Sequence, residues 1–411
     1  MKHLTLAGLC LGGLLASSAA LAAPTSILFV GNSYTFGRLD PVMSYNWANV
    51  HDLTAPFQAL YSGGSNAWEP HPWGGVPGIF KQFTVQAGLD YDVSISARNA
   101  ASLRGQFLNT ASPLWDLRGN VASKKWDTVV LQEQSDAALP NGMGKNANQA
   151  TFNAYADQFE RFIHNGAAQT YTESALFGSQ AKCVATGLST GSCNTSRVIP
   201  ANANASAATK VYLLETWARP DMVFAHKITK ADVTHPDGSP IVDTSAAGGA
   251  ATLYYGSLAA MTADLKTSFL AKAASNPGFA GVIPAGEAFQ MAIDLGLAKS
   301  GGFYDANGVY TQAQAGDLMN LWWNDYLHAS KYGSYLSALV QFGSITGLDP
   351  NSLGANEIAA VDLGISKADA LTLQHIASAQ LGFPAPVPEP ATWAMALLGL
   401  GALAYKRRRQ A

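Results

Sequence analysis

The chain has 411 residues, of which 48% are hydrophobic and 13% are charged, a composition typical of a globular protein with a large core and not of a disordered chain. The formal net charge is −3, but Lys2 contributes +1 and the tail from Val387 contributes +3, so the body between them carries −7. An acidic body offers no electrostatic attraction to nucleic acid, and we expect no nucleic-acid partner.

The first residues have the features of a secretory signal peptide. A positive start at Lys2 is followed by a short apolar run and by the small residues Ala20-Leu21-Ala22. The apolar run is too short to favour a retained membrane span. We therefore expect residues 1–22 to be removed and the rest of the chain to be exported.

Five apolar runs of strand length alternate with longer segments that can hold helices. Parallel strands need crossover connections and are buried on both faces, so this alternation predicts an α/β fold with a five-stranded parallel sheet between two helical layers. The predicted strands span 27–31, 91–97, 128–134, 210–217 and 281–285. Helical spacing predicts crossover helices at 152–164 and 258–274, and a terminal helix that runs to residue 340.

The first predicted strand ends at Gly31-Asn32-Ser33, where Ser33 comes directly after the strand. Ligands of parallel sheets collect beyond the carboxyl ends of the strands, so Ser33 is expected at a binding edge. By itself, this stretch is better explained as an ordinary turn than as a catalytic site.

Asp325 and His328, three positions apart near the other end of the chain, supply what a reactive serine needs. A serine hydroxyl becomes a nucleophile when an imidazole takes its proton, and a carboxylate must hold the other ring nitrogen. Asp325-x-x-His328 alone is also consistent with a helix cap and a surface histidine. Together with Ser33 on this architecture, it predicts a catalytic triad of Ser33, His328 and Asp325.

The arrangement resembles the SGNH (GDSL-type) hydrolase superfamily. Gly31-Asn32-Ser33-Tyr34 resembles the first sequence block, with Asn32 where many members have Asp, and Asp325-x-x-His328 resembles the last block. The resemblance covers roughly residues 26–340. It implies a three-layer, flavodoxin-like fold, ester hydrolysis through Ser33, and no cofactor.

The middle blocks of the superfamily supply hydrogen-bond donors to the oxyanion. Residues 126–135 resemble the strand that ends in Gly-x-Asn-Asp, and Gln134 stands at the position of the Asn. The block that normally offers a glycine N–H falls in residues 98–103, which contain no glycine, so the backbone N–H of Ala101 or Ser102 is expected there. The predicted oxyanion hole consists of Ser33, Ala101 and Gln134.

Asn32, Trp217 and Trp323 are predicted to contact the substrate, since they lie beside the triad or after the fourth strand. Core packing explains the two tryptophans equally well. Once Cys10 leaves with the signal peptide, Cys183 and Cys193 remain, and an oxidising compartment favours a disulfide between them. No ligand cluster with metal-binding spacing is present, so no metal is expected.

The end of the chain carries a second resemblance. Val387-Pro388-Glu389-Pro390, an uncharged run to Tyr405 and a basic cluster from Lys406 resemble a PEP-CTERM sorting signal, the substrate of an exosortase. A plain C-terminal anchor is the alternative, and either explanation keeps the basic end in the cytoplasm. The predicted organisation is a hydrolase-like domain at 24–345, a helical extension and linker at 346–386, and a sorting tail at 387–411 that contacts the inner membrane.

These observations predict an exported serine esterase in the periplasm, on the cell surface or outside the cell. Members of the superfamily that this chain resembles cleave acetyl groups from polysaccharides, and PEP-CTERM tails go with exopolysaccharide-producing bacteria. By this association, a carbohydrate O-acetyl ester is the expected substrate. Two alternatives remain open. One is a carbohydrate-binding or matrix protein with an idle triad, and the other is an acyltransferase on the same fold.

Overall fold

The computed structural model describes residues 23–56, 70–109, 116–227, 249–309 and 318–384. The predicted signal peptide at 1–22 and the predicted tail at 387–411 lie outside these ranges. Among the described residues, no helix combines the length and the apolar character that crossing a bilayer requires.

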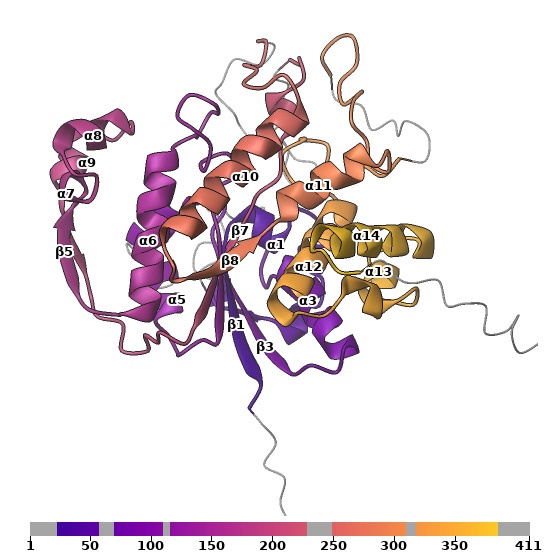
Figure 1. Cartoon of the computed structure of the whole chain (residues 1–411), viewed down its shortest axis with the longest axis horizontal. Helices are drawn as coiled ribbons and strands as arrows, with labels where there is room; N and C mark the ends of the chain where they lie inside the picture. Colours follow the sequence, from indigo (N-terminus) through magenta and orange to yellow (C-terminus); the bar gives the residue numbers. More distant parts are fainter. Residues whose placement is uncertain (1–22, 57–69, 110–115, 228–248, 310–317, 385–411) are drawn as a thin grey trace, which may run out of the picture.

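A six-stranded sheet in the order β2-β3-β1-β4-β7-β8 forms the centre of the molecule, and all of its neighbouring strands are parallel (Figure 1). The strands are β1 Thr25–Gly31, β2 His51–Asp52, β3 Tyr91–Ala97, β4 Thr128–Gln132, β7 Lys210–Leu214 and β8 Phe279–Ile283. All five predicted strands are present, and the α/β prediction is confirmed. The predicted number of strands was one too low, because β2 has two residues and no apolar run that could signal it.

Helices cover both faces of the sheet (Figure 1). The pairs Phe107–Phe159 and Phe152–Phe269 join the helices of one layer, and Phe83 packs against Tyr335 across the other layer. The first layer consists of α4 Leu103–Leu108, α5 Leu117–Val121, α6 Gln149–His164 and α10 Leu258–Ser275. The second consists of α3 Gly75–Gln86, α11 Ala285–Asp294, α12 Lys331–Thr346 and α14 Lys367–Gln380.

Short elements complete the fold. They are α1 Ser33–Phe36, α13 Ile358–Asp362 and the 3-10 turns η1 Trp47–Asn49, η3 Pro220–Met222 and η5 Pro350–Leu353. The segment after residue 346, predicted to be helical, holds η5, α13 and α14, and α14 packs against α12. The predicted helices at 152–164 and 258–274 correspond to α6 and α10, and the predicted terminal helix is α12.

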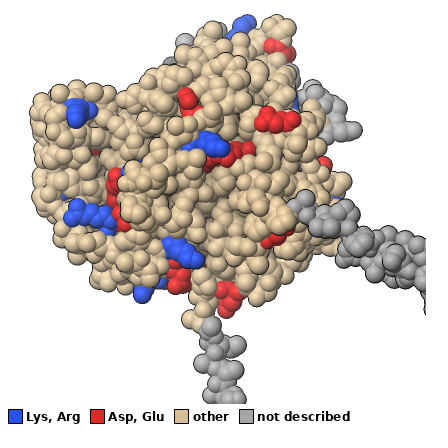
Figure 2. Space-filling model, in the orientation of Figure 1, with Lys and Arg blue, Asp and Glu red and all other residues tan. Residues whose placement is uncertain are grey.

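Burial explains why the strands read as continuous apolar runs. Every residue of β4 is buried, and so are Ile27 to Val30 in β1, because helices cover the central strands from both sides. The interior positions of β1 and β4 are accordingly apolar, whereas β3 also buries the small hydroxyls of Ser94 and Ser96. On the face that Figure 2 shows, Lys, Arg, Asp and Glu are scattered among uncharged residues, without a broad area of one sign.

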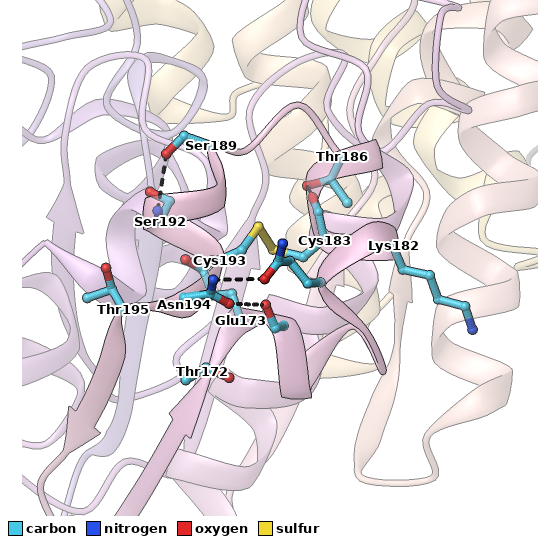
Figure 3. The surroundings of a disulfide bond; sticks show 12 residues. Thr172, Glu173, Lys182, Cys183, Thr186, Ser189, Ser192, Cys193, Asn194 and Thr195 are labelled. Atoms are coloured by element: carbon cyan, nitrogen blue, oxygen red, sulfur yellow. Dashed lines mark hydrogen bonds between the residues drawn. A yellow bond between two sulfur atoms is a disulfide. The ribbon is translucent and has the colours of Figure 1, made fainter.

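A disulfide-linked excursion stands off the α6 side of the sheet (Figure 1). It contains β5 Gln169–Thr172, α7 Glu173–Leu176, α8 Gln180–Ala185, α9 Thr190–Asn194 and β6 Ser196–Ile199. The predicted disulfide is present: Cys183 in α8 and Cys193 in α9 are bonded, and both are fully buried (Figure 3). Glu173 ties the excursion to the body, because its carboxylate accepts hydrogen bonds from Arg104 and Arg197.

Replacing Cys183 and Cys193 by Ser is expected to destabilise the excursion by about 3 kcal/mol, the loop-entropy value for a cross-link of this length. Because the excursion has its own helices and its own two-stranded ladder, limited proteolysis should cut between 169 and 199 while the rest of the chain stays intact. Peptide mapping of the cleavage sites measures this. Cleavage spread evenly over the body would contradict it.

Candidate active site

Ser33 lies immediately beyond the carboxyl end of β1, as its place in the sequence predicted. Asn32 caps α1, since its side-chain oxygen accepts the Tyr34 N–H at 3.0 Å, and this leaves Ser33 as the first residue of the helix. No described residue accepts a hydrogen bond from the Ser33 N–H. The hydroxyl and the N–H of Ser33 are therefore both free of backbone pairing at the sheet edge.

Ser33 opens into a pocket of about 340 Å³. Its walls come from the segments after β1, β3, β4 and β7, together with the 325–328 turn. The lining residues are Asn32, Ser33, Tyr34, Arg38, Asn99, Ala100, Gln134, Ser135, Lys145, Asn146, Arg219, Asp325, Leu327 and His328. Most of these side chains are amides, hydroxyls or charged groups.

The structure brings Ser33, His328 and Asp325 together. His328 Nε2 lies 2.8 Å from Ser33 Oγ, and His328 Nδ1 lies 2.5 Å from Asp325 Oδ2. The other oxygen of Asp325 accepts the N–H groups of Leu327 at 3.0 Å and His328 at 2.9 Å. One carboxylate therefore shapes the turn and also holds the ring.

The charge of Asp325 is stabilised in place. Burial alone would raise the pKa of its carboxyl, but the His328 imidazole and the two backbone N–H groups outweigh burial and hold the pKa below its usual value. Asp325 is therefore ionised at neutral pH. An ionised Asp325 favours the tautomer in which Nδ1 of His328 carries the proton and Nε2 accepts from Ser33.

Tyr34 links the nucleophile segment to the base segment directly. Its hydroxyl donates to the Leu327 carbonyl at 2.8 Å, and the Trp217 indole donates to the same oxygen at 3.1 Å. The rings of Tyr34 and Trp217 stack with centroids 4.1 Å apart. The predicted substrate contact of Trp217 needs correction: the residue is 1% exposed, lies behind Tyr34 and does not line the pocket.

The predicted oxyanion donors differ in their placement. Gln134 lines the pocket with a partly exposed side chain. The Ala101 N–H instead donates to the Arg98 carbonyl at 3.2 Å, which removes it from the predicted role. Ala100 replaces it at the pocket, because its φ of 54° turns the chain and no described residue accepts its N–H. The superfamily pattern has a glycine here, and the sequence does not reveal an alanine whose backbone lies in the left-handed region.

Asn32 and Trp323 lie next to the triad. The Asn32 amide donates to the Ala101 carbonyl at 3.0 Å, so its side chain joins the segments after β1 and β3. Trp323 is partly exposed, and its N–H donates to the His328 carbonyl at 2.8 Å, but it does not line the pocket. Contact of either residue with a substrate stays a prediction.

Three cationic residues of the pocket were not predicted. Arg219 is buried and donates to Asp221, Asp136 and Ser135. Burial would lower the pKa of its guanidinium, but the two carboxylates raise it above the usual value. Its position after the fourth strand was the one available signal. Arg38 and Lys145 lie in loops without a recognisable motif.

Within the described ranges, no group of three or more His, Cys, Asp or Glu side chains is placed to hold a metal ion. The pocket instead has a hydroxyl, an imidazole, a carboxylate and several N–H donors. These are the components of nucleophilic acyl transfer.

Residues 386–410 match the PEP-CTERM protein-sorting motif. The chain carries a PEP-CTERM signal. Such a signal indicates recognition by an exosortase, and it implies export and processing at the membrane through the C-terminal tail. The resemblance of the tail is thereby confirmed.

The solved structures that are similar to this chain include two bacterial proteins. A provisionally assigned SGNH hydrolase from Slackia heliotrinireducens has 15% identity and a TM-score of 0.34, covering 79% of this chain and 100% of its own. A DUF4886 family protein from Bacteroides uniformis has 12% identity and a TM-score of 0.38, covering 90% of this chain and 99% of its own. No curated protein matches the chain in sequence.

Tyr34→Phe is expected to lower by about tenfold the kcat of any acyl transfer at Ser33, because His328 loses one of its two positional ties to the Ser33 segment. The loss of stability should be about 1 kcal/mol, the usual value for one buried hydrogen bond. Steady-state kinetics and thermal unfolding measure the two effects. Tyr335→Phe is the matched control, since it removes a buried hydroxyl in α12 that accepts a hydrogen bond from Gln374 in α14, and it should leave kcat unchanged.

Proposed function

We propose that this chain is an exported serine esterase with Ser33 as nucleophile, His328 as general base and Asp325 as the group that orients the base. One observation carries the proposal. A chain of hydrogen bonds runs from Ser33 Oγ through both ring nitrogens of His328 to Asp325, and Ser33 opens into a pocket large enough for an ester group.

In the proposed reaction, Ser33 Oγ attacks the acyl carbon while His328 Nε2 takes the hydroxyl proton. The imidazolium then gives this proton to the leaving alcohol, and the acyl group stays on Ser33. Water attacks the acyl-enzyme, His328 takes a proton from the water, and Ser33 recovers its proton as the acid leaves. Asp325 stays ionised and stabilises the imidazolium in both steps.

The negative oxygen that develops on the acyl carbon needs donors already in place. The free N–H groups of Ser33 and Ala100 and the side-chain amide of Gln134 all lie at the pocket. We propose these three as the oxyanion donors, each worth about 3 kcal/mol of transition-state stabilisation. Gln134 can donate as an asparagine would, from a side chain one methylene longer.

The lining of the pocket favours a small acyl group on a hydroxyl-rich alcohol. Among the described residues that line it, the least polar are Ala100, Leu327 and the buried Tyr34, and these three form no apolar channel for a long chain. Asn99, Gln134 and Asn146 offer amides suited to sugar hydroxyls. Since the PEP-CTERM signal implies export, we propose an O-acetyl ester on an extracellular carbohydrate as the substrate.

Ser33→Ala is expected to abolish hydrolysis of p-nitrophenyl acetate, and Asp325→Asn to lower kcat by about 10⁴, because the wrong tautomer of His328 would face Ser33. Both variants keep the size of the side chain, so thermal unfolding should show folded proteins. Equal turnover in wild type and Ser33→Ala would remove Ser33 from the mechanism.

The same assay separates the two alternative functions. A protein that binds acetylated polysaccharide but turns over no ester would be a carbohydrate-binding or matrix protein. Transfer of acetyl to an added sugar at the expense of hydrolysis would identify an acyltransferase.

Acyl-chain preference tests the proposed substrate class separately. The value of kcat/KM should fall by about tenfold or more from p-nitrophenyl acetate to p-nitrophenyl octanoate, since polar walls gain nothing from burying methylene groups and lose their own hydration. A preference for octanoate would contradict the acetyl ester while leaving the triad intact.

A further inference from the structure

Glu133 is a buried carboxyl group that the proposed chemistry does not use. It follows β4 directly and is 1% exposed. Its Oε1 accepts two backbone hydrogen bonds, from Gln134 at 2.6 Å and from Leu103 at 2.9 Å. Its Oε2 is buried and has no hydrogen-bond partner among the described residues. A carboxyl group in such a place costs free energy, so its presence requires a reason.

The two N–H groups belong to the two arms of the proposed oxyanion site. Gln134 carries the amide donor, and Leu103 begins α4 immediately after the turn that contains Ala100 and Ala101. One oxygen of Glu133 therefore fastens the segment after β4 to the segment after β3. The Gln106 amide bridges the same arms more weakly, donating to the Ala101 and Gln132 carbonyls at 3.2 and 3.3 Å.

We infer that Glu133 is a positioning residue of this site, whose ionised carboxylate holds Gln134 and the Ala100 turn in register with Ser33. The inference rests on the proposed esterase function. Charge-assisted hydrogen bonds are roughly twice as strong as neutral ones, so protonation of Glu133 loosens both arms at once. Donors in an oxyanion site act through fixed placement, and looser arms stabilise the transition state less.

The surroundings of Glu133 allow it to change charge near neutral pH. Burial raises the pKa of its carboxyl to about 7, the Gln134 and Leu103 N–H groups offset part of this, and the charge of Asp136 raises it further. Asp136, the charged group that acts on Glu133, is itself paired with Arg219. The folded state thus favours the neutral acid, and its stability falls as pH rises from the unfolded value through about 7. The ionised form of Glu133, which holds the two arms, therefore makes the folded protein less stable than the neutral form does.

The pH dependence of kcat separates positioning from simple packing. In the wild type, the acid limb of log kcat should be steeper than a slope of 1, because protonation of Glu133 lowers kcat in addition to protonation of the general base. Glu133→Gln offers only a neutral acceptor that cannot titrate, as the protonated acid does, so its kcat at pH 8 should fall below that of the wild type and its acid limb should have a slope of 1. Glu133→Ala removes the acceptor and should lower kcat by about tenfold or more at every pH, with a much smaller change in KM.

Glu357 provides the matched control. It is also 1% exposed, and its two oxygens accept the N–H groups of Ala359 and Ala360 at 2.7 Å each, at the start of α13. Burial raises the pKa of its carboxyl as well. Glu357→Gln and Glu357→Ala should change stability without altering the slope of the acid limb or the value of kcat.

Amide hydrogen exchange tests the inference without relying on turnover. Relative to wild type at pH 8, Glu133→Ala should lose protection in peptides covering 98–108 and 131–137, whereas Glu357→Ala should lose it around α13. Suppose that hydrolysis depends on Ser33, but the Glu133 variants have the same acid-limb slope and the same exchange pattern as the wild type. That result would overturn the positioning role of Glu133 and leave the esterase proposal intact. Hydrolysis that survives Ser33→Ala would instead overturn the esterase proposal.

Discussion

The candidate site depends on one closure, in which the segment around His328 returns to the end of β1. Ser33 and His328 are 295 positions apart, and the Tyr34 hydroxyl and the Leu327 carbonyl join their neighbours directly. Closing a long loop costs little more entropy than closing a shorter one, so this separation is tolerable if packing holds the ends. Trp217 supplies that packing, since its indole stacks on Tyr34 on one side and on Phe289 of α11 on the other. Hydrogen bonds set the register of the closure, and buried aromatic surface makes it stable.

The pKa values of two buried carboxyl groups at this site are shifted in opposite directions. Asp325 lies against an imidazole and accepts two N–H groups, and its pKa is held below the usual value although burial acts against it. Glu133 also accepts two N–H groups, but no cationic side chain among the described residues stabilises its charge, and burial raises its pKa to about 7. The difference lies in the partners and not in the depth of burial. When the surroundings shift the pKa values of two acid groups in opposite directions, the two groups can serve different tasks.

The sheet and the meeting of Ser33, His328 and Asp325 could be predicted from the sequence, whereas the supporting contacts could not. Long apolar runs and the spacing of Asp325 and His328 are local patterns, so they are visible in the sequence. β2 has only two residues, and its pairing depends on the neighbouring strand. Ala100 was missed because its role depends on a backbone angle. The misplaced substrate role of Trp217 has the same origin: its position after the fourth strand was correct, but only the fold shows that the ring lies behind Tyr34.

Backbone strain gathers where the proposed chemistry lies. Among the described residues, Asn46, Ala100 and Tyr326 are the non-glycine residues with positive φ, and two of these three flank the pocket. The left-handed region costs a residue with a Cβ about 1–2 kcal/mol, so something must hold each one. Tyr326 sits between Asp325 and Leu327 with a fully buried ring packed on Phe303, which fixes the turn that aims His328. Ala100 has no such side-chain anchor. Its turn is held instead by backbone bonds around Arg98 and by the Glu133 carboxyl group, which accepts the Leu103 N–H at the start of the next helix.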